Sequence, residues 1–187
     1  MGNALRFVPT PLAGLTVVVG QPSVDERGHF VRVFCTQEFA ALRTGLQFAQ
    51  VNLSRTARQG TVRGMHFQWP PAADAKLVRC VQGSVFDVAI DLRAGSPTFL
   101  RWHAVELNAA AESGVFIPEG FAHGFQALTD EAELLYLHTA AYAPSLEGGL
   151  RHDDPRLEIR WPLPAQNVSA RDRSFALLDD SFAGIGT

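Results

Sequence analysis

Most apolar positions of this chain fall in short runs that are rich in β-branched and aromatic residues and are separated by turn-forming residues. Leu15–Val19 and Phe30–Cys35 are two such runs, and the segment Asp25-Glu26-Arg27-Gly28 between them is typical of a turn. Many short strands in close succession favour an all-β fold, an antiparallel sandwich or barrel, over alternating strands and helices. Further strands are predicted at Phe48–Ser54, Thr61–Gln68, Lys76–Gln82, Val85–Asp91, Phe99–Leu107, Val115–Pro118, Ala122–Leu128 and Glu133–Tyr142.

Helical patterns are rare in the same chain. Gln37–Arg43, which is closed by Gly45, is the one convincing helix. Segment 144–187 contains several prolines and shows no regular strand or helix pattern. Loops and short helices that wrap the barrel are therefore expected there. A length of 187 residues suits a single domain over residues 1–187 with its core at 15–172.

Composition narrows the class of function. Hydrophobic residues make up 47% of the chain and charged residues 19%, so a sizeable core can be buried. A net charge of −3 gives no support for a nucleic-acid or membrane-surface binder. Cys35 and Cys80 lie in apolar runs and are expected to be buried free thiols in a reducing compartment. Because the chain has neither an apolar signal core at its start nor a run of about 18 apolar residues, a cytoplasmic location is expected.

The stretch Val62–Gln68 combines an apolar strand pattern with groups that can do chemistry. His66 can take up a proton near neutral pH, and the nearby cations Arg63 and Lys76 suggest an anionic ligand. The alternative is a histidine that is satisfied within the core. Strict alternation places Arg63 and His66 on opposite faces of a strand, so both reach one pocket only if Gly64 forms a bulge.

Other polar residues also have plain alternatives. Lys76 is either a cation of the site or a solvated strand end, and His123, which lies among glycines, is either a polar group of the site or a core residue. Tyr136 shares a strand face with His138 and can donate a proton, although an ordinary barrel aromatic is the alternative. Asp172 can orient a catalytic histidine through its second ring nitrogen, or it can cap a helix at the surface.

Metal and cofactor sites are not indicated by the sequence. No two of the six histidines are two residues apart, so the ligand spacing of a typical metal site is missing. No G-x-G-x-x-G sequence follows a predicted strand, which argues against a nicotinamide or flavin site. We expect neither a metal nor a cofactor, and a metal-dependent barrel enzyme is the alternative. The histidines are His29, His66, His103, His123, His138 and His152.

Longer motifs carry a resemblance to a known family over nearly the whole chain. They are Asp25-Glu26-Arg27-Gly28, Arg63-Gly64-x-His66-x-Gln68, Lys76-Leu77-Val78-Arg79, Gly83-x-Val85-Phe86-Asp87-Val88, Gly95-Ser96-Pro97-Thr98-Phe99, Ile117–Phe125 and Trp161-Pro162. Together they resemble the dTDP-4-dehydrorhamnose 3,5-epimerase family. The resemblance implies a cupin-like antiparallel β-sandwich or jelly-roll barrel with a few short helices. It also implies a homodimer whose partner contributes N-terminal residues to the site, and Leu15–Val19 is compatible with an edge strand that pairs across subunits.

The resemblance assigns a role to each candidate residue. His66 is expected to be the general base, and Asp172 its partner. Tyr136 is expected to be the opposing acid, and Lys76 the cation that stabilises the enolate oxygen. The implied substrate-binding residues are Arg27, Arg63 and His123 for the diphosphate and sugar, Gln50 and Asn52 for the nucleotide, Tyr142 for stacking on the base, and Glu147 and Arg171 to complete the pocket.

The implied reaction inverts C3 and C5 of the nucleotide-diphosphate sugar dTDP-4-dehydro-6-deoxy-D-glucose and forms dTDP-4-dehydro-L-rhamnose. Deprotonation beside the C4 ketone needs a base on one face and an acid on the other, without a redox cofactor. Arg32 and Val51 stand where the family usually has acidic residues, and His29 where it has an aromatic one. An epimerase specific for C3, or for another activating nucleotide such as CDP, therefore stays open. A non-catalytic barrel that binds nucleotide sugars is the alternative from another class.

Overall fold

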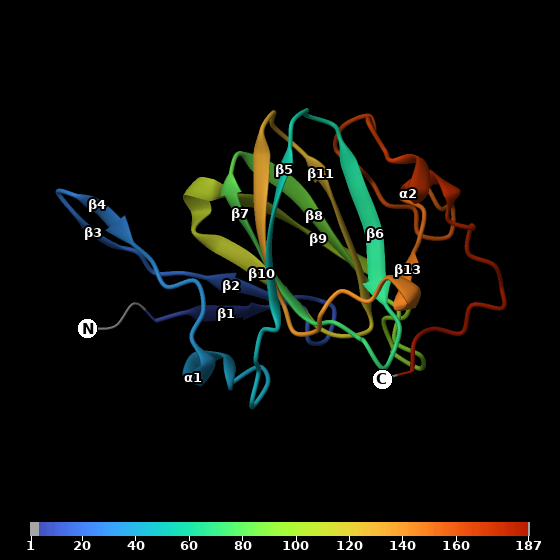
Figure 1. Ribbon diagram of the computed structural model, residues 1–187, viewed down its shortest axis with the longest axis horizontal. Coiled ribbons are helices and arrows are strands. Elements are labelled where there is room, and N and C mark those ends of the chain that lie inside the picture. Colours follow the sequence, from blue (N-terminus) through green and yellow to red (C-terminus); the bar gives the residue numbers. More distant parts are fainter. Residues whose placement is uncertain (1–3, 187) are drawn as a thin grey trace.

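The computed structural model describes residues 4–186, and its two large sheets are both antiparallel (Figure 1). This architecture confirms the expected all-β class. The six-stranded sheet has the order β1 (Arg6–Pro9), β2 (Thr16–Val19), β10 (Ser113–Ile117), β7 (Lys76–Gln82), β12 (Ala132–His138) and β5 (Gln50–Thr56). The five-stranded sheet has the order β13 (Glu147–Gly149), β6 (Val62–Gln68), β11 (Phe121–Ala127), β8 (Ser84–Asp91) and β9 (Trp102–Asn108).

The main core lies between the two sheets. Val78 and Leu134 of the six-stranded sheet pack in one buried cluster with Val85, Ala89 and Phe125 of the five-stranded sheet. Alternate residues of each strand point to this core, which explains the period-two apolar pattern in the sequence.

The chain beyond residue 143 lies against the outer side of the five-stranded sheet. Its regular elements are η2 (Pro144–Leu146), β13 and α2 (Ala170–Ser174). Leu150, Leu157 and Ile185 pack against Val88 and Ile90, which alternate with the inward-facing residues of β8. Both faces of the five-stranded sheet are therefore covered, and α2 lies beside β6, as Figure 1 shows.

The N-terminal edge of the fold differs from the prediction. The sequence of Leu15–Val19 is compatible with an edge strand, but β2 pairs with β1 on one side and with β10 on the other. Arg6–Pro9 therefore forms the edge of the six-stranded sheet. The segment before Pro9 has a weaker apolar pattern than β2, so local sequence did not indicate this additional strand.

Two further predictions near the N-terminus are too long. Only the first residue of the strand expected at Phe30–Cys35 is in a strand: β4 (Gly28–Phe30) ends there and pairs with β3 (Ser23–Asp25) in a hairpin that extends away from the sheets (Figure 1). The helix expected at 37–43 is the single turn α1 (Thr36–Phe39). Apolar residues of segments 31–35 and 40–43 pack around the fully buried Phe39 instead of continuing the regular elements. A separate short helix, η1 (Ala109–Ala111), follows β9. No helix within residues 4–186 is long and apolar enough to cross a membrane.

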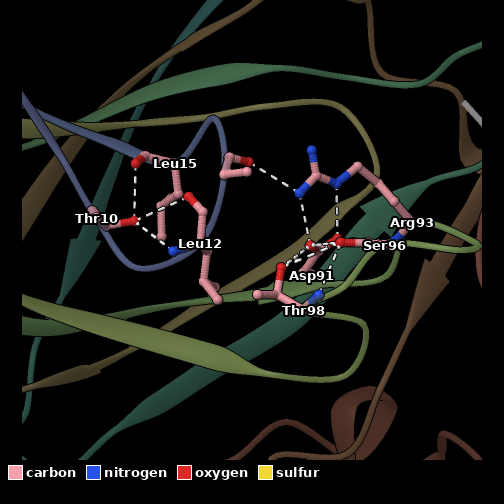
Figure 2. A network of polar contacts seen from close by, with 8 residues as sticks. Thr10, Leu12, Leu15, Asp91, Arg93, Ser96 and Thr98 are labelled. Carbon is pink, nitrogen blue, oxygen red and sulfur yellow. Dashed lines mark hydrogen bonds and ion pairs between the residues drawn. The ribbon is translucent and has the colours of Figure 1, made fainter.

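Asp91 is fully buried at the end of β8. Its contacts connect the following loop to the turn between β1 and β2 (Figure 2). Its carboxylate accepts hydrogen bonds from Arg93 Nε at 2.8 Å, Ser96 Oγ at 2.6 Å and Thr98 Oγ1 at 2.6 Å. Arg93 also donates to the carbonyl oxygen of Ala13 at 3.0 Å. Burial alone would raise the pKa of Asp91, but these donors lower it to about 2.

We expect Asp91→Asn to lower the free energy of unfolding by about 2 kcal/mol at neutral pH, because the amide cannot replace the charge that these donors stabilise. The wild type should lose this contribution as the pH falls from about 4 toward 2, since the pKa is lower in the folded state than in the unfolded state. Urea unfolding at neutral pH and at about pH 3 measures both effects. Asp180→Asn, at a fully exposed carboxylate, is the control. Equal acid dependence in the wild type and Asp91→Asn would contradict this account.

Candidate active site

A cavity of about 400 Å³ opens between the two sheets and contains most of the residues predicted from the sequence. Strands β5, β7 and β12 of the six-stranded sheet carry four of them, and β6 and β11 of the five-stranded sheet carry three. The two groups therefore approach the cavity from opposite sides. The predicted residues that line it are Gln50, Asn52, Arg63, His66, Lys76, His123, Tyr136, Tyr142 and Glu147.

Three predicted residues lie outside this lining. Asp172 is on α2, and its carboxylate is hydrogen-bonded to the ring of His66. Arg171, its neighbour on α2, forms an ion pair with Glu147 at 2.5 Å between Nη2 and Oε2. Arg27 lies in the exposed turn between β3 and β4, where 84% of its side chain is accessible. Within this chain, the hairpin places Arg27 away from the cavity.

The bulge that the sequence required at Gly64 is confirmed. Arg63 and His66 of β6 both pair with residues of β11. Two residues lie between them in β6, but only one residue lies between their partners in β11. Gly64 has a φ of 119°, and an added Cβ would lie 2.5 Å from the Cα of Gly124. Glycine alone fits this backbone, and the bulge lets Arg63 and His66 face the same cavity.

His66 and Asp172 form a hydrogen-bonded pair at one side of the cavity. His66 Nε2 lies 2.8 Å from Asp172 Oδ1, and Asp172 Oδ2 accepts from the backbone N–H of Gly64 at 3.3 Å. Burial would raise the pKa of Asp172, but its hydrogen bonds with His66 and with the backbone N–H of Gly64 hold the pKa below its usual value. Asp172 is therefore a carboxylate that can only accept, so Nε2 of His66 carries a proton. The Nδ1 atom of the neutral ring is left as the basic nitrogen.

A second pair joins His123 to Asp87. The two side chains are buried, and His123 Nε2 lies 2.8 Å from Asp87 Oδ2. The ring of His123 meets the ring of Tyr136 edge to face, with centroids 6.0 Å apart. Sequence reasoning gave Asp87 no role, although an acidic residue inside the apolar run Val85–Ile90 is itself a signal of a buried partner.

A third pair, also missed, joins His138 to Asp74. His138 Nδ1 lies 2.7 Å from Asp74 Oδ2, and the same oxygen lies 3.4 Å from Lys76 Nζ. Asp74 is 4% exposed at its side chain. Sequence reasoning placed His138 on the same face as Tyr136 but assigned it no function, and it did not consider Asp74. The signal was the acidic residue two positions before Lys76, where alternation brings both side chains to one face.

Tyr136 faces the cavity from the six-stranded sheet, across from His66 on the five-stranded sheet. Its hydroxyl oxygen accepts a hydrogen bond from Ser54 Oγ at 3.5 Å. Burial, which disfavours the phenolate, raises the pKa of Tyr136 well above its ordinary value. The phenol is therefore protonated at any physiological pH and is suited to donating a proton.

The mouth of the cavity is formed by Tyr142, Glu147 and Arg171. The hydroxyl of Tyr142 donates to Glu147 Oε2 at 2.6 Å, and the same oxygen accepts from Arg171. Gln50 Oε1 accepts from the backbone N–H of Tyr142 at 3.1 Å. More than half of Tyr142 is exposed, so its ring is available for a planar ligand at the entrance.

The three departures from the family pattern lie outside the cavity lining. Arg32 is hydrogen-bonded to Glu38, and His29 Nε2 lies 2.7 Å from Glu112 Oε1. The side chain of Val51 is on the exposed face of β5. Among residues 4–186, no group of three or more histidine, cysteine or acidic side chains is arranged to hold a metal ion.

Comparison with known proteins gives one consistent result. A family model described as dTDP-4-dehydrorhamnose 3,5-epimerase matches residues 9–180. A dTDP-4-dehydrorhamnose 3-epimerase of Streptomyces niveus is 40% identical over 95% of this chain and 86% of its own length. A dTDP-4-dehydrorhamnose 3,5-epimerase of Shigella flexneri is 43% identical over 83% of this chain and 87% of its own length.

A solved structure shows the same similarity in three dimensions. It is that of dTDP-6-deoxy-D-glucose-3,5-epimerase from Legionella pneumophila in complex with dTDP-4-keto-L-rhamnose. Its TM-score with this chain is 0.89 at 34% identity, and the match covers 97% of this chain and 98% of that one. The cupin-like fold implied by the sequence motifs is therefore confirmed.

The two tyrosines of the chain allow a direct test of the environment of the cavity. The pKa of Tyr142 is raised mainly by its hydrogen bond to Glu147, but the ring is accessible and can still ionise in the folded protein. We expect Tyr142→Phe to show no phenolate absorbance up to about pH 11, since burial keeps the remaining Tyr136 protonated. Spectrophotometric titration with circular dichroism as a check on folding measures this. Tyr136→Phe is the matched control and should retain one titrating phenol. A phenolate band in folded Tyr142→Phe at this pH would contradict the buried environment.

Proposed function

The chain belongs to the dTDP-4-dehydrorhamnose 3,5-epimerase family, and we propose that it converts dTDP-4-dehydro-6-deoxy-D-glucose into dTDP-4-dehydro-L-rhamnose by inverting C3 and C5. The observation that carries this proposal is the opposition of two proton-transfer groups across one cavity. The His66–Asp172 pair lies on one sheet side and the protonated Tyr136 lies on the other.

The chemistry follows from the acidity of a C–H bond beside a ketone. His66 Nδ1 removes the proton from C3 or C5, and Asp172 stabilises the imidazolium that forms. The electron pair moves onto the C4 oxygen and forms an enolate. Tyr136 then delivers a proton to the same carbon from the opposite face, which inverts the stereocentre. One proton leaves and another is added, so substrate and product have the same composition.

The enolate needs a cation close to its oxygen, and we assign this role to Lys76. Lys76 is buried, lines the cavity and is the only lysine of the chain. A fixed cation in a site of low polarity stabilises developing negative charge more than the same cation does in water. Asp74, on the other side of the Lys76 ammonium, keeps the buried charge paired when no substrate is bound.

The remaining lining residues are suited to a nucleotide diphosphate. Arg63 and His123 are assigned to the sugar and diphosphate, and Gln50 and Asn52 of β5 to the nucleotide. The accessible ring of Tyr142 is assigned to stacking on the base, with Glu147 and Arg171 holding that ring at the entrance.

The position of Arg27 supports a homodimer. Its predicted role in substrate binding is not met within its own chain, because the β3–β4 hairpin extends away from the sheets (Figure 1) and Arg27 does not line the cavity. The six-stranded sheet also ends in β5, on which Val51 and Leu53 are more than half exposed. We propose that a second copy covers such apolar surface and that the hairpin reaches the cavity of the partner.

The free thiols of Cys35 and Cys80 support a cytoplasmic location.

The function is tested by incubating the protein with the keto sugar in deuterated water. A 3,5-epimerase incorporates deuterium at both C3 and C5, whereas a 3-epimerase, like the named Streptomyces niveus relative, incorporates it at one carbon. The dTDP-, CDP- and UDP-linked sugars compared side by side report the nucleotide preference. Exchange at neither carbon with any of the three would overturn the proposed function and favour a binding protein.

We expect His66→Ala to lower the rate of exchange by about 10²–10⁴-fold, which is the usual contribution of a general base. Binding of dTDP, followed by calorimetry, should stay close to the wild-type value because His66 is assigned to the sugar carbons and not to the nucleotide. His103→Ala, at a histidine of β9 that does not line the cavity, is the control for removing an imidazole. A fully active His66→Ala protein would remove this residue from the role of base.

A further inference from the structure

One hydrogen-bonded pair of the cavity, Asp74 and His138, has only a minor part in the proposed mechanism. Asp74 and His138 both line the cavity, and their side chains are 4% and 16% exposed. They lie on the six-stranded sheet side, where the proposed acid Tyr136 and the cation Lys76 are also found. The base His66 belongs to the other sheet. Asp74 and His138 are therefore placed to influence the proposed acid Tyr136 and the cation Lys76, and not the base.

Asp74 connects the two strands that carry these groups. Its Oδ2 atom lies 2.7 Å from His138 Nδ1 on β12 and 3.4 Å from Lys76 Nζ on β7. Its Oδ1 atom accepts from the backbone N–H of Ala140 at 3.2 Å. Burial would raise the pKa of Asp74, but His138, Lys76 and this N–H together hold the pKa below its ordinary value. Asp74 is therefore a buried carboxylate that fixes two side chains at once.

His138 carries this constraint to Tyr136. The two rings are stacked, with an interplanar angle of 11° and centroids 5.8 Å apart. The ring of His123 meets Tyr136 edge to face, and His123 is itself held by Asp87. The ring of Tyr136 therefore contacts two imidazoles, and the stacked ring of His138 limits its rotation by packing. A ring held in this way has little freedom to turn away from the substrate.

We propose that Asp74 and His138 form a positioning pair for the acid side of the epimerisation. Asp74 holds the Lys76 ammonium at the enolate oxygen, and the His138 ring holds the Tyr136 phenol in line with the carbon that it protonates. The pair acts through Lys76 and Tyr136 and does not itself exchange a proton with the sugar. This inference rests on the proposed function, because it assigns the pair to steps of that reaction.

The two contributions can be separated by one ratio. An enolate formed by His66 is either reprotonated on the face that it left, which gives deuterated substrate, or protonated on the opposite face, which gives inverted product. The ratio of deuterated substrate to inverted product therefore reports how well the acid is placed. Loss of enolate stabilisation lowers both outcomes together and leaves the ratio unchanged.

Two substitutions of His138 separate the effect of its ring from the effect of its hydrogen bond to Asp74. His138→Asn keeps a donor for Asp74 but removes the ring that stacks on Tyr136, and we expect it to raise the ratio about tenfold. His138→Phe keeps a ring but removes the donor, and we expect it to leave the ratio within about twofold of the wild type. Asp74→Asn should lower exchange and inversion together by about 10–100-fold, with little change in the ratio, because the cation is no longer held. His103→Asn is the matched control and should behave as the wild type.

The contact between Asp74 and Lys76 also has a readout that does not depend on turnover. Since Lys76 is the only lysine, protein containing lysine labelled with ¹⁵N at the side chain gives one ammonium signal. We expect this signal to shift and broaden in Asp74→Asn at fixed pH, and to be retained in His103→Asn. Circular dichroism and thermal unfolding of each variant confirm that it is folded.

The possible results separate the two proposals. A ratio that is unchanged in His138→Asn, or a rise that is equal in His138→Asn and His138→Phe, would overturn the role of the ring stacking. An unchanged ammonium signal in Asp74→Asn would overturn the role of Asp74. Wild-type protein that exchanges no sugar proton would overturn the proposed function itself, and with it the assignment of the pair to a reaction step.

Discussion

A carboxylate that is buried among apolar residues must be paired, and this requirement determines how the cavity is lined. Asp74, Asp87 and Asp172 are almost fully buried, and each has a histidine within 2.8 Å. An unpaired charge in these places would cost several kcal/mol, so each pair forms as the fold closes. The consequence is that three imidazole rings are held in set orientations around one cavity, before any ligand arrives.

The sandwich converts these pairs into a directional arrangement. His66 is on one sheet and Tyr136 on the other, so the proposed base and the proposed acid line the cavity from opposite sides. Neither strand can turn independently, because each is hydrogen-bonded to neighbours on both sides. Gly64 adds the one local irregularity that the site needs, since its bulge brings Arg63 and His66 to the same side.

Much of the fold could be predicted from local patterns. Apolar and β-branched runs correctly indicated the strands β5 to β8, of which β7 and β8 have one face in the main core and β6 packs under the C-terminal chain. The same reasoning was wrong for the continuation of Phe30–Cys35 and for the helix at 37–43. There the apolar residues pack around Phe39 as irregular chain, and nothing in the local sequence shows that partner. Edge strand β1 was missed for the same reason, since it depends on pairing with β2.

The sequence by itself determined the chemistry that is available: a histidine flanked by cations, a tyrosine on a strand face, and motifs long enough to place the chain in its family. It also indicated that Gly64 had to bend its strand. The family resemblance paired Asp172 with His66, but only the tertiary structure paired Asp74 with His138 and Asp87 with His123, which lie 64 and 36 residues apart. Contacts over such separations are set by the registers of the two sheets and by the path of the C-terminal chain, and no local pattern records them.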